Sequence, residues 1–375
     1  MRILVFAAAE ITVELICKPF IEELATKGHQ IFICFPHKTT KSDWMENFDV
    51  IQIHQIDLRS SFIIRNILVT NKIEMMINFT VKPMVFGFLA TIFLKNEPIV
   101  VNAFRGLGRL FQAPSNFYSR FIYSNVRLLL RVATKKANIV WLTNQSDLTE
   151  LQCRGFLDER QSIIVTKNSI NVERFFPCKA AEKYQIRKKH GLSLDTFIVV
   201  CVSRLMRDKG IGYFAEAIKA LKKKSVNVTG VIVGPEDTSN LDAKFSVEDL
   251  LSVDFRRLPT KPSVIEYYHL ADAAILASNY REGGYPRSLL EPMLCGLPVI
   301  ASNTPFVAGA VDFGKVGLLV DVESSEQIER QILHLMNNSV LREKLRVNGR
   351  EFVIRNFDQR QIAKNFVDEL AKCLL

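Results

Sequence analysis

The sequence predicts an α/β protein made of two doubly wound domains that face each other across a cleft. Short apolar runs alternate with helical patterns along both halves of the chain, which is typical of parallel β-α-β units. The chain has 375 residues, enough for two domains. Its composition, 48% hydrophobic and 23% charged, is that of a soluble globular protein and excludes general disorder.

The first half begins with a buried strand rather than a leader peptide, because its apolar run stops at Glu10 without a small-residue cleavage pattern. Seven apolar runs predict strands: Ile3–Phe6, Ile31–Phe35, Ile51–Ile53, Met75–Asn78, Ile99–Val101, Ile139–Leu142 and Ile163–Val165. Helical patterns lie between several of them: Val13–Lys27, Pro83–Lys95, Asn116–Lys136 and Gln145–Cys153.

A second series of the same kind begins near Thr196. Its predicted strands are Phe197–Val202, Val228–Val233, Val253–Arg256, Ala273–Leu276, Pro298–Ala301 and Gly317–Val320. Its predicted helices are Ile211–Lys223, Ser263–Leu270, Ser288–Leu294, Ser325–Met336, Leu341–Arg355 and Gln359–Cys373.

The polar and aromatic connector Asn168–Pro177 separates the two series and is typical of a hinge. We therefore expect an N-terminal domain over residues 1–170, a second domain over 171–355, and a last helix within 356–375 that returns to the first domain. Ligands of doubly wound sheets bind outside the carboxyl ends of the strands, so the expected site is the cleft between the domains.

Charge and cysteine content narrow the class of protein. The chain carries a net charge of +10, which favours phosphate-bearing partners such as nucleic acid, anionic lipid or a phosphorylated small molecule. Seven scattered cysteines without a Cys-x-x-Cys pair argue against a disulfide framework or a zinc site and fit a reducing cytosol. The longest uncharged apolar run, Pro83–Leu94, is too short to span a bilayer, so we expect a soluble or peripheral protein.

The first candidate site is the loop Val202–Gly210, which follows a predicted strand and opens a helix. Arg204 and Lys209 lie five residues apart in this loop and can converge on one diphosphate, to which the helix N-terminus adds its positive dipole. The alternative is an ordinary solvated basic loop.

The second candidate site is the segment Ser278–Ser302, which predicts a strand, a glycine-rich loop, a helix, a turn and another strand. Glu282 lies in the loop, where it can meet a sugar, and Glu291 lies near the start of the helix, where it can accept hydrogen bonds from a ribose diol. Taken alone, Glu291 is also explained as an acid that complements the helix dipole, and Glu282 as a surface acid.

These two segments together resemble the nucleotide-sugar half of the GT-B retaining glycosyltransferases of family 4. Arg204 and Lys209 match the Arg-x4-Lys loop of that family, and Leu289–Ser302 matches its Leu-Leu-Glu-x-Met-x-Cys-Gly-x-Pro-Val-Ile-Ala-Ser run. The connector Asn168–Pro177 is similar to its Asn-Gly-Val-Asp-x-x-x-Phe-x-Pro segment, with Ser169 in place of glycine.

The resemblance implies a GT-B fold and a role for each matched residue. Arg204, Lys209 and Glu282 would be catalytic, the two cations by stabilising the departing nucleoside diphosphate. Neither a cofactor nor a metal is expected, because the two cations do the work of a metal and the nucleotide sugar is a co-substrate. The remaining donor-binding residues would be Ser203, Leu258, Gly283, Gly284, Tyr285, Pro286, Arg287, Ser288 and Glu291.

The sequence departs from the family pattern at three places. Eight residues, rather than seven, separate Glu282 from Glu291, with Gly284 as the extra one. The glycine-rich loop after the first strand is replaced by Ala7–Glu10. Arg105 stands where many relatives have a histidine, so no catalytic histidine is named.

The acceptor is expected to bind the first domain. Between Pro98 and Ser146 there are seven basic residues and no acid, interleaved with aromatic side chains. This pattern favours a membrane surface, although a core of aromatics beneath a solvated basic face is the alternative. The candidate acceptor and membrane residues are Arg105, Gly106, Gly108, Arg109, Phe111 and Arg120. Nucleic acid is disfavoured, because no recognised binding motif accompanies the charge.

The Gly-Leu-Gly turn at residues 106–108 is similar to that of bacterial enzymes that extend polyprenyl-diphosphate-linked saccharides. The resemblance thus predicts a cytoplasmic glycosyltransferase at the inner membrane surface, with a UDP-sugar as donor and a lipid-linked saccharide as acceptor. A UDP-sugar 2-epimerase and a catalytically degenerate sugar-nucleotide-binding subunit remain as alternatives.

Overall fold

A computed structural model describes residues 1–36, 43–111, 117–236, 248–252, 254–260, 263–280, 282–283, 285–305 and 307–374. The chain divides into two compact units, which are described separately. Unit 1 comprises Met1–Ser169 together with Gln359–Leu375, and unit 2 comprises Ile170–Asp358.

Unit 1 is built on a seven-stranded parallel sheet with the order β3-β2-β1-β4-β5-β6-β7. The order reverses direction between β1 and β4, as in a doubly wound fold. The strands are β1 (Arg2–Ala7), β2 (Gln30–Pro36), β3 (Asp49–Ile53), β4 (Met75–Phe79), β5 (Ile99–Ala103), β6 (Ile139–Leu142) and β7 (Ser162–Val165).

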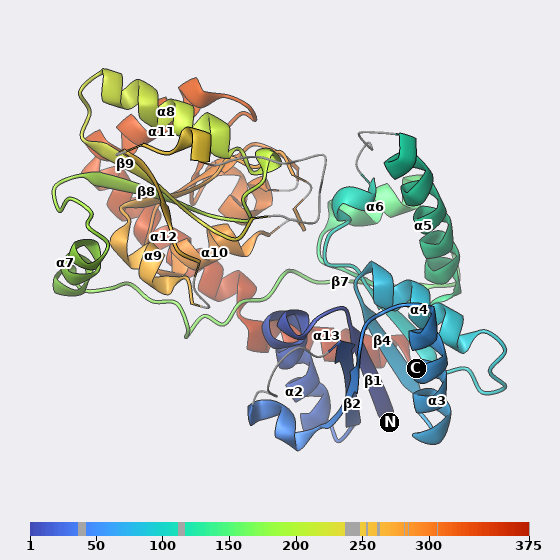
Figure 1. Cartoon of the computed structure of the whole chain (residues 1–375). Coiled ribbons are helices and arrows are strands. Elements are labelled where there is room, and N and C mark those ends of the chain that lie inside the picture. Colours follow the sequence, from blue (N-terminus) through green and yellow to red (C-terminus); the bar gives the residue numbers. More distant parts are fainter. Residues whose placement is uncertain are drawn as a thin grey trace. The chain divides into compact units, whose positions relative to one another are not determined.

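Helices cover both faces of this sheet, which explains why its strands are nearly continuous apolar runs. Ile3 and Val5 pack with α2 and α13, whereas Leu4 and Phe6 pack with α3 and α4. Figure 1 shows α3, α4 and α5 on one side and α2 with α13 on the other. The helices are α1 (Glu10–Thr12), α2 (Lys18–Thr26), α3 (Leu58–Thr70), α4 (Val81–Thr91), α5 (Phe117–Lys136), α6 (Gln145–Cys153) and α13 (Gln359–Cys373).

The last helix, α13, is part of the core of unit 1 although it follows unit 2 in sequence. The ring of Phe366 stacks on that of Trp141 at 3.8 Å between centroids, and the ring of Phe20 meets both edge-on. The Trp141 indole donates a hydrogen bond of 2.8 Å to Thr166 Oγ1, which satisfies the polar atom of this buried ring.

Unit 2 repeats the plan with a six-stranded parallel sheet of order β10-β9-β8-β11-β12-β13. Its strands are β8 (Phe197–Val202), β9 (Val228–Val233), β10 (Phe255–Leu258), β11 (Ala273–Leu276), β12 (Val299–Ser302) and β13 (Leu318–Val320). Its helices are α7 (Ala180–Lys189), α8 (Ile211–Lys223), α9 (Ile265–Leu270), α10 (Arg287–Leu294), α11 (Ser325–Asn337) and α12 (Ser339–Phe357).

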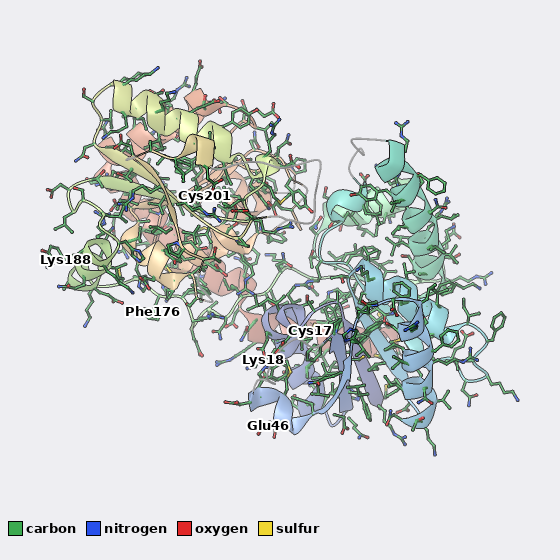
Figure 2. The ribbon with its side chains drawn as sticks, in the orientation of Figure 1. Cys17, Lys18, Glu46, Phe176, Lys188 and Cys201 are labelled. Atoms are coloured by element: carbon green, nitrogen blue, oxygen red, sulfur yellow. The ribbon has the colours of Figure 1, made fainter. Side chains whose placement is uncertain are left out.

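The two faces of the unit 2 sheet are again covered separately. Ile198 and Val200 of β8 share a core with α9, α10 and α12, and Val199 and Cys201 share another with α8 and α11. Figure 2 adds the side chains to this framework, with Cys201 labelled on unit 2 and Cys17 on unit 1.

The predicted fold class is confirmed, and most predicted elements are present. The helices α1, α3 and α7 have no counterpart in the prediction. The predicted helix Val13–Lys27 is interrupted, because Val13–Cys17 forms a π-helical turn before α2. The strand predicted at Val253–Arg256 begins later, so that Leu258 belongs to β10 instead of to the loop after it. No helix of the described residues is long and apolar enough to cross a bilayer.

Candidate functional site

The Arg204 loop and the Glu282 loop follow neighbouring strands of unit 2. Arg204 and Lys209 come after β8, Glu282 comes after β11, and these two strands pair at the point where the strand order reverses. Carboxyl ends of adjacent parallel strands open a crevice at such a point, and ligands of doubly wound sheets bind there. The topology therefore brings the three predicted catalytic side chains to one edge of the sheet.

A glycine allows the two loops to approach closely. Gly210 has a φ of +71°, and a Cβ at this position would lie 2.0 Å from the carbonyl oxygen of Ala277. Beside it, the Asn279 amide donates to the Asp208 carbonyl at 2.8 Å and the Ser278 hydroxyl donates to the same oxygen at 3.2 Å. The 3₁₀ turn that carries Lys209 is thus fastened to the loop that carries Glu282.

Lys209 and Glu282 form a buried ion pair. The Lys209 side chain is 8% exposed and that of Glu282 12%, and Lys209 Nζ donates to Glu282 Oε1. Ser278 Oγ lies 2.9 Å from the same carboxylate oxygen, so its one proton is shared between this oxygen and the Asp208 carbonyl. The sequence places both residues at the site but gives no signal that they contact each other.

An aromatic ring that the prediction did not single out joins the two cations. The Arg204 guanidinium lies 5.8 Å and Lys209 Nζ lies 4.7 Å from the centroid of the Tyr280 ring. Both distances suit cation–π attraction. The backbone amide of Tyr280 donates to Ser278 Oγ at 3.1 Å, which holds the part of the loop that carries the ring. In the sequence, Tyr280 lies two residues before Glu282, within the predicted site segment Ser278–Ser302. This position is the one sequence signal that points to Tyr280.

Glu291 belongs to a second buried group on α10. Its Oε1 accepts from Arg287 Nε at 3.0 Å and its Oε2 accepts from the Tyr268 hydroxyl at 3.0 Å. Burial raises the pKa of the Glu291 carboxyl, an effect that the Arg287 charge opposes. The partner Tyr268 comes from α9 and was not predicted; a buried tyrosine hydroxyl needs such a partner.

The other predicted donor-binding residues of unit 2 vary in exposure. Ser203 is half-buried and its hydroxyl donates to the Arg204 carbonyl at 3.2 Å, while Leu258 is buried in β10. The ring of Tyr285 packs on Phe357 at 5.0 Å, and burial raises its pKa. Pro286 caps α10 and is buried; Gly283 and Ser288 are half-buried, and Gly284 lies outside the described residues.

The predicted acceptor residues all belong to unit 1. Arg105 follows β5, donates to Asn168 Oδ1 at 3.0 Å, and lies 5.4 Å from the Trp141 ring centroid. Gly106 and Gly108 both have positive φ, Arg120 of α5 is exposed, and the side chain of Arg109 lies outside the described part.

Phe111 is buried in unit 1, contrary to the prediction that it contacts a membrane. Its side chain is 3% exposed and packs on Phe156 with ring centroids 5.2 Å apart, so it belongs to the core of unit 1. Phe104 and Leu107 are buried with it, whereas Phe121 is exposed. The aromatic residues of this region are therefore divided between core and surface.

The two cations beside the Tyr280 ring give the unit 2 site its chemistry. A half-buried tyrosine ring holds two cations at the carboxyl ends of β8 and β11, where an anionic ligand of a doubly wound sheet is expected. Among the described residues, no three His, Cys, Asp or Glu side chains gather in a way that would hold a metal ion. Two cations held in this way can bind a phosphate-bearing group through charge-assisted hydrogen bonds.

A comparison with protein-family models finds a match within unit 2. Residues 182–352 match the family model described as "Glycosyl transferases group 1". This match spans nearly all of unit 2 and includes Arg204, Lys209, Glu282 and Glu291.

Two curated relatives and one solved structure extend the likeness beyond unit 2. The capsular polysaccharide biosynthesis glycosyltransferase CapM of Staphylococcus aureus is 26% identical over 74% of this chain and 71% of its own. The N,N'-diacetylbacillosaminyl-diphospho-undecaprenol alpha-1,3-N-acetylgalactosaminyltransferase of Campylobacter jejuni is 25% identical over 93% of both chains. HepE of Anabaena in complex with UDP-glucose is similar in structure, with a TM-score of 0.80, 17% identity, and coverage of 99% of this chain and 100% of that one. The two Rossmann-like units have the GT-B fold.

Proposed function

We propose that this protein is a retaining glycosyltransferase that moves a hexose or N-acetylhexosamine from a UDP-sugar to a saccharide on a polyprenyl diphosphate. The product would be a surface polysaccharide or glycan. The observation that carries the proposal is the pair of cations, Arg204 and Lys209, held on Tyr280 beside Glu282. The family match and the names of the two curated relatives support the same class of activity.

Arg204 and Lys209 bind the diphosphate and stabilise the negative charge that develops on it as the glycosidic bond breaks. Charges already in position when the bond breaks are usually the largest catalytic contribution. Lys209 exchanges Glu282 for phosphate when the donor binds, which releases the Glu282 carboxylate to accept hydrogen bonds from the transferred sugar. No metal is required in this scheme.

The nucleoside is held by the second group of residues. Glu291 accepts from the ribose hydroxyls, since each of its oxygens has a lone pair beyond those used by Arg287 and Tyr268. The backbone near Leu258 frames the uracil, and residues 283–288 frame the sugar. The HepE complex with UDP-glucose supports a uridine donor by analogy of fold.

Transfer proceeds on the front face of the sugar. The acceptor hydroxyl attacks the anomeric carbon from the side that the diphosphate leaves, and the leaving phosphate oxygen takes the hydroxyl proton. The acceptor and its lipid carrier bind unit 1 near Arg105 and α5 at the cytoplasmic surface of the membrane.

Thermal unfolding with a panel of nucleotide sugars tests donor binding. A ligand that binds only the folded state raises the melting temperature by mass action. UDP-hexosamines are expected to raise it, and Lys209→Ala is expected to abolish most of the rise. Lys219→Ala, which removes the same charge from α8, is the control and should leave it unchanged.

Product analysis by NMR tests the reaction itself. With a polyprenyl-diphosphate-linked saccharide as acceptor, the new glycosidic bond should keep the anomeric configuration of the donor. An inverted product contradicts front-face transfer. Isomerisation of UDP-N-acetylglucosamine without acceptor indicates the epimerase instead, and UDP binding without turnover of any acceptor indicates a non-catalytic subunit.

A further inference from the structure

The positive charge of the protein is concentrated in one segment. Residues 58–146 contain twelve Lys or Arg and only two acids, Glu74 and Glu97, which is a surplus of +10. The whole chain has the same net charge, so the remaining residues are neutral in sum. Neither acid lies in α3, α4 or α5.

The three acid-free helices form one continuous layer of unit 1. They lie side by side over one face of the sheet, with α4 between α3 and α5 (Figure 1). We call their outer surface, together with the turns after α3 and α4, the basic apolar face. Its described basic side chains that are exposed or half-buried are Arg59, Arg65, Lys72, Lys82, Lys95, Arg120, Arg127, Arg131, Lys135 and Lys136.

Large apolar side chains are exposed among these cations. On α3, Leu58, Phe62 and Val69 follow helical spacing and form a single stripe, in which Phe62 is 75% exposed. On α5, the side chains described from residue 120 onward include five exposed large apolar ones: Phe121, Ile122, Leu128, Leu129 and Val132. Large apolar side chains exposed together with cations on neighbouring helices are typical of an interaction surface.

Among the described side chains of this face, Phe93 is the most exposed large apolar one, at 87%. Its backbone has a φ of +65°, a conformation that costs free energy for a bulky residue and that is kept when surrounding structure enforces it. The Arg65 guanidinium provides such support, because it donates to the Ile92 carbonyl at 3.0 Å and to the Phe93 carbonyl at 3.2 Å. The fold thus maintains a strained turn that points an aromatic ring into solvent.

Four cations and two acids line the two hollows beside the Phe93 turn. A hollow between α3 and the turn is lined by Arg65, Lys72 and Lys95, with Glu74 and Glu97 also in its wall. A second hollow, between the turn and the end of α5, is lined by Phe93, Glu97 and Lys136. An exposed apolar side chain with basic neighbours suits a partner that has an apolar interior beneath an anionic surface.

We infer that the basic apolar face docks onto an anionic lipid bilayer, with Phe93 and Phe62 inserted between the headgroups. The inference rests on the proposed function, which puts a lipid-linked acceptor beside unit 1, and it extends the membrane contact from α5 to α3 and the Phe93 turn. Basic side chains bind anionic headgroups while aromatic rings enter the interface. A second copy is a poorer occupant, because it would bring two faces of the same charge together.

Site-directed fluorescence tests the insertion of Phe93 directly. Phe93→Trp is compared with Phe313→Trp, since Phe313 of unit 2 is also exposed, at 73%, and also has a positive φ. With vesicles of phosphatidylglycerol and brominated phosphatidylcholine, the emission gained through Phe93→Trp should be quenched. The emission gained through Phe313→Trp should not be quenched. The unsubstituted chain gives the emission of Trp44 and Trp141, which is subtracted from both. Equal quenching of both, or quenching of neither while the protein is bound to vesicles, overturns the inference.

A second measurement separates this inference from the proposed function. Phe93→Ser should weaken sedimentation with phosphatidylglycerol vesicles at least about fivefold, and more than Phe313→Ser does. It should leave the melting-temperature rise caused by UDP unchanged. If the double variant Arg120→Ser, Lys135→Ser loses vesicle binding and Phe93→Ser keeps it, α5 alone is the membrane contact and the inference is wrong. Loss of self-association or of RNA binding through Phe93→Ser, with vesicle binding intact, also contradicts it. Failure of UDP to bind tests the proposed function instead.

Discussion

At the scale of single residues, the site is organised by pairs of charges and their aromatic neighbours. Lys209 is held by Glu282 and by the ring of Tyr280, and Glu291 is held by Arg287 and Tyr268. Each carboxylate therefore already has partners before any ligand binds. Changes of charge at Glu282 and Glu291 are expected to have opposite consequences for nucleotide binding.

Glu282→Gln should tighten UDP binding, because in the proposed scheme the Glu282 carboxylate competes with the diphosphate for Lys209. We expect a decrease in Kd of roughly 10-fold, equivalent to about 1.4 kcal/mol. Transfer should nevertheless slow, since the proposed contact to the sugar is lost. Calorimetric titration and steady-state kinetics measure the two effects, and weaker UDP binding by Glu282→Gln would contradict the competition.

Glu291→Gln should weaken UDP binding roughly 10-fold or more, as expected for a hydrogen bond to a charged group. Its effect on stability depends on pH. Because burial raises the pKa of Glu291, the folded state holds its proton more tightly than the unfolded state does. The charged carboxylate therefore lowers the free energy of unfolding as pH rises from about 4, the unfolded pKa, through the higher folded pKa.

Glu291→Gln removes this charge, so its stability relative to the parent should improve between pH 4 and pH 8. Denaturant titrations at both pH values measure the difference. A relative stability that falls with increasing pH would show that the Arg287 charge outweighs burial.

At the scale of elements, loop geometry decides whether the cations meet. The site depends on the close approach of the turn before α8 to the end of β11, which Gly210 permits. The helix α8 also contains Gly212, whose Cβ would have no neighbour within 4 Å. The chain thus provides its own control for the role of Gly210.

Gly210→Ala should destabilise unit 2 by about 1–3 kcal/mol, since it adds backbone strain and a clash with the Ala277 carbonyl. It should also weaken UDP binding, because Lys209 precedes it. Gly212→Ala should instead stabilise the helix by about 0.5–1 kcal/mol and leave binding unchanged. Thermal unfolding with and without UDP measures both, and equal behaviour of the two variants would contradict the close approach.

Apolar runs for the strands and helical periodicity for the helices made most elements predictable. Strands buried on both faces, such as β8 and β9, appear in the sequence as unbroken apolar runs. Helix α3 escaped prediction because its outward stripe is apolar, which obscures the usual polar face, and α7 because it is mostly polar. The placement of Arg204, Lys209 and Glu282 at one edge of the sheet was predictable, because each follows a predicted strand. The contacts of Tyr280 and Tyr268 were not, because they join segments that only the folded chain brings together.

At the scale of the whole molecule, the chain passes from unit 1 to unit 2 at Ser169 and returns at Gln359. Each unit has its own cores, and α13 completes that of unit 1 through Phe366. Separate cores predict separate responses to ligand and mutation.

Two unfolding transitions are therefore expected in calorimetry. UDP should raise the transition of unit 2 alone, and Phe366→Ala should lower that of unit 1 by an amount equivalent to about 3–5 kcal/mol. A single transition that both changes shift together would contradict independent units.

A crystal structure with a bound UDP-sugar is the most direct test of the central claim. We predict that diphosphate oxygens lie within hydrogen-bond distance of the Arg204 guanidinium and Lys209 Nζ, with the contact between Lys209 and Glu282 broken. A diphosphate bound away from both cations, with that ion pair intact, would contradict the account.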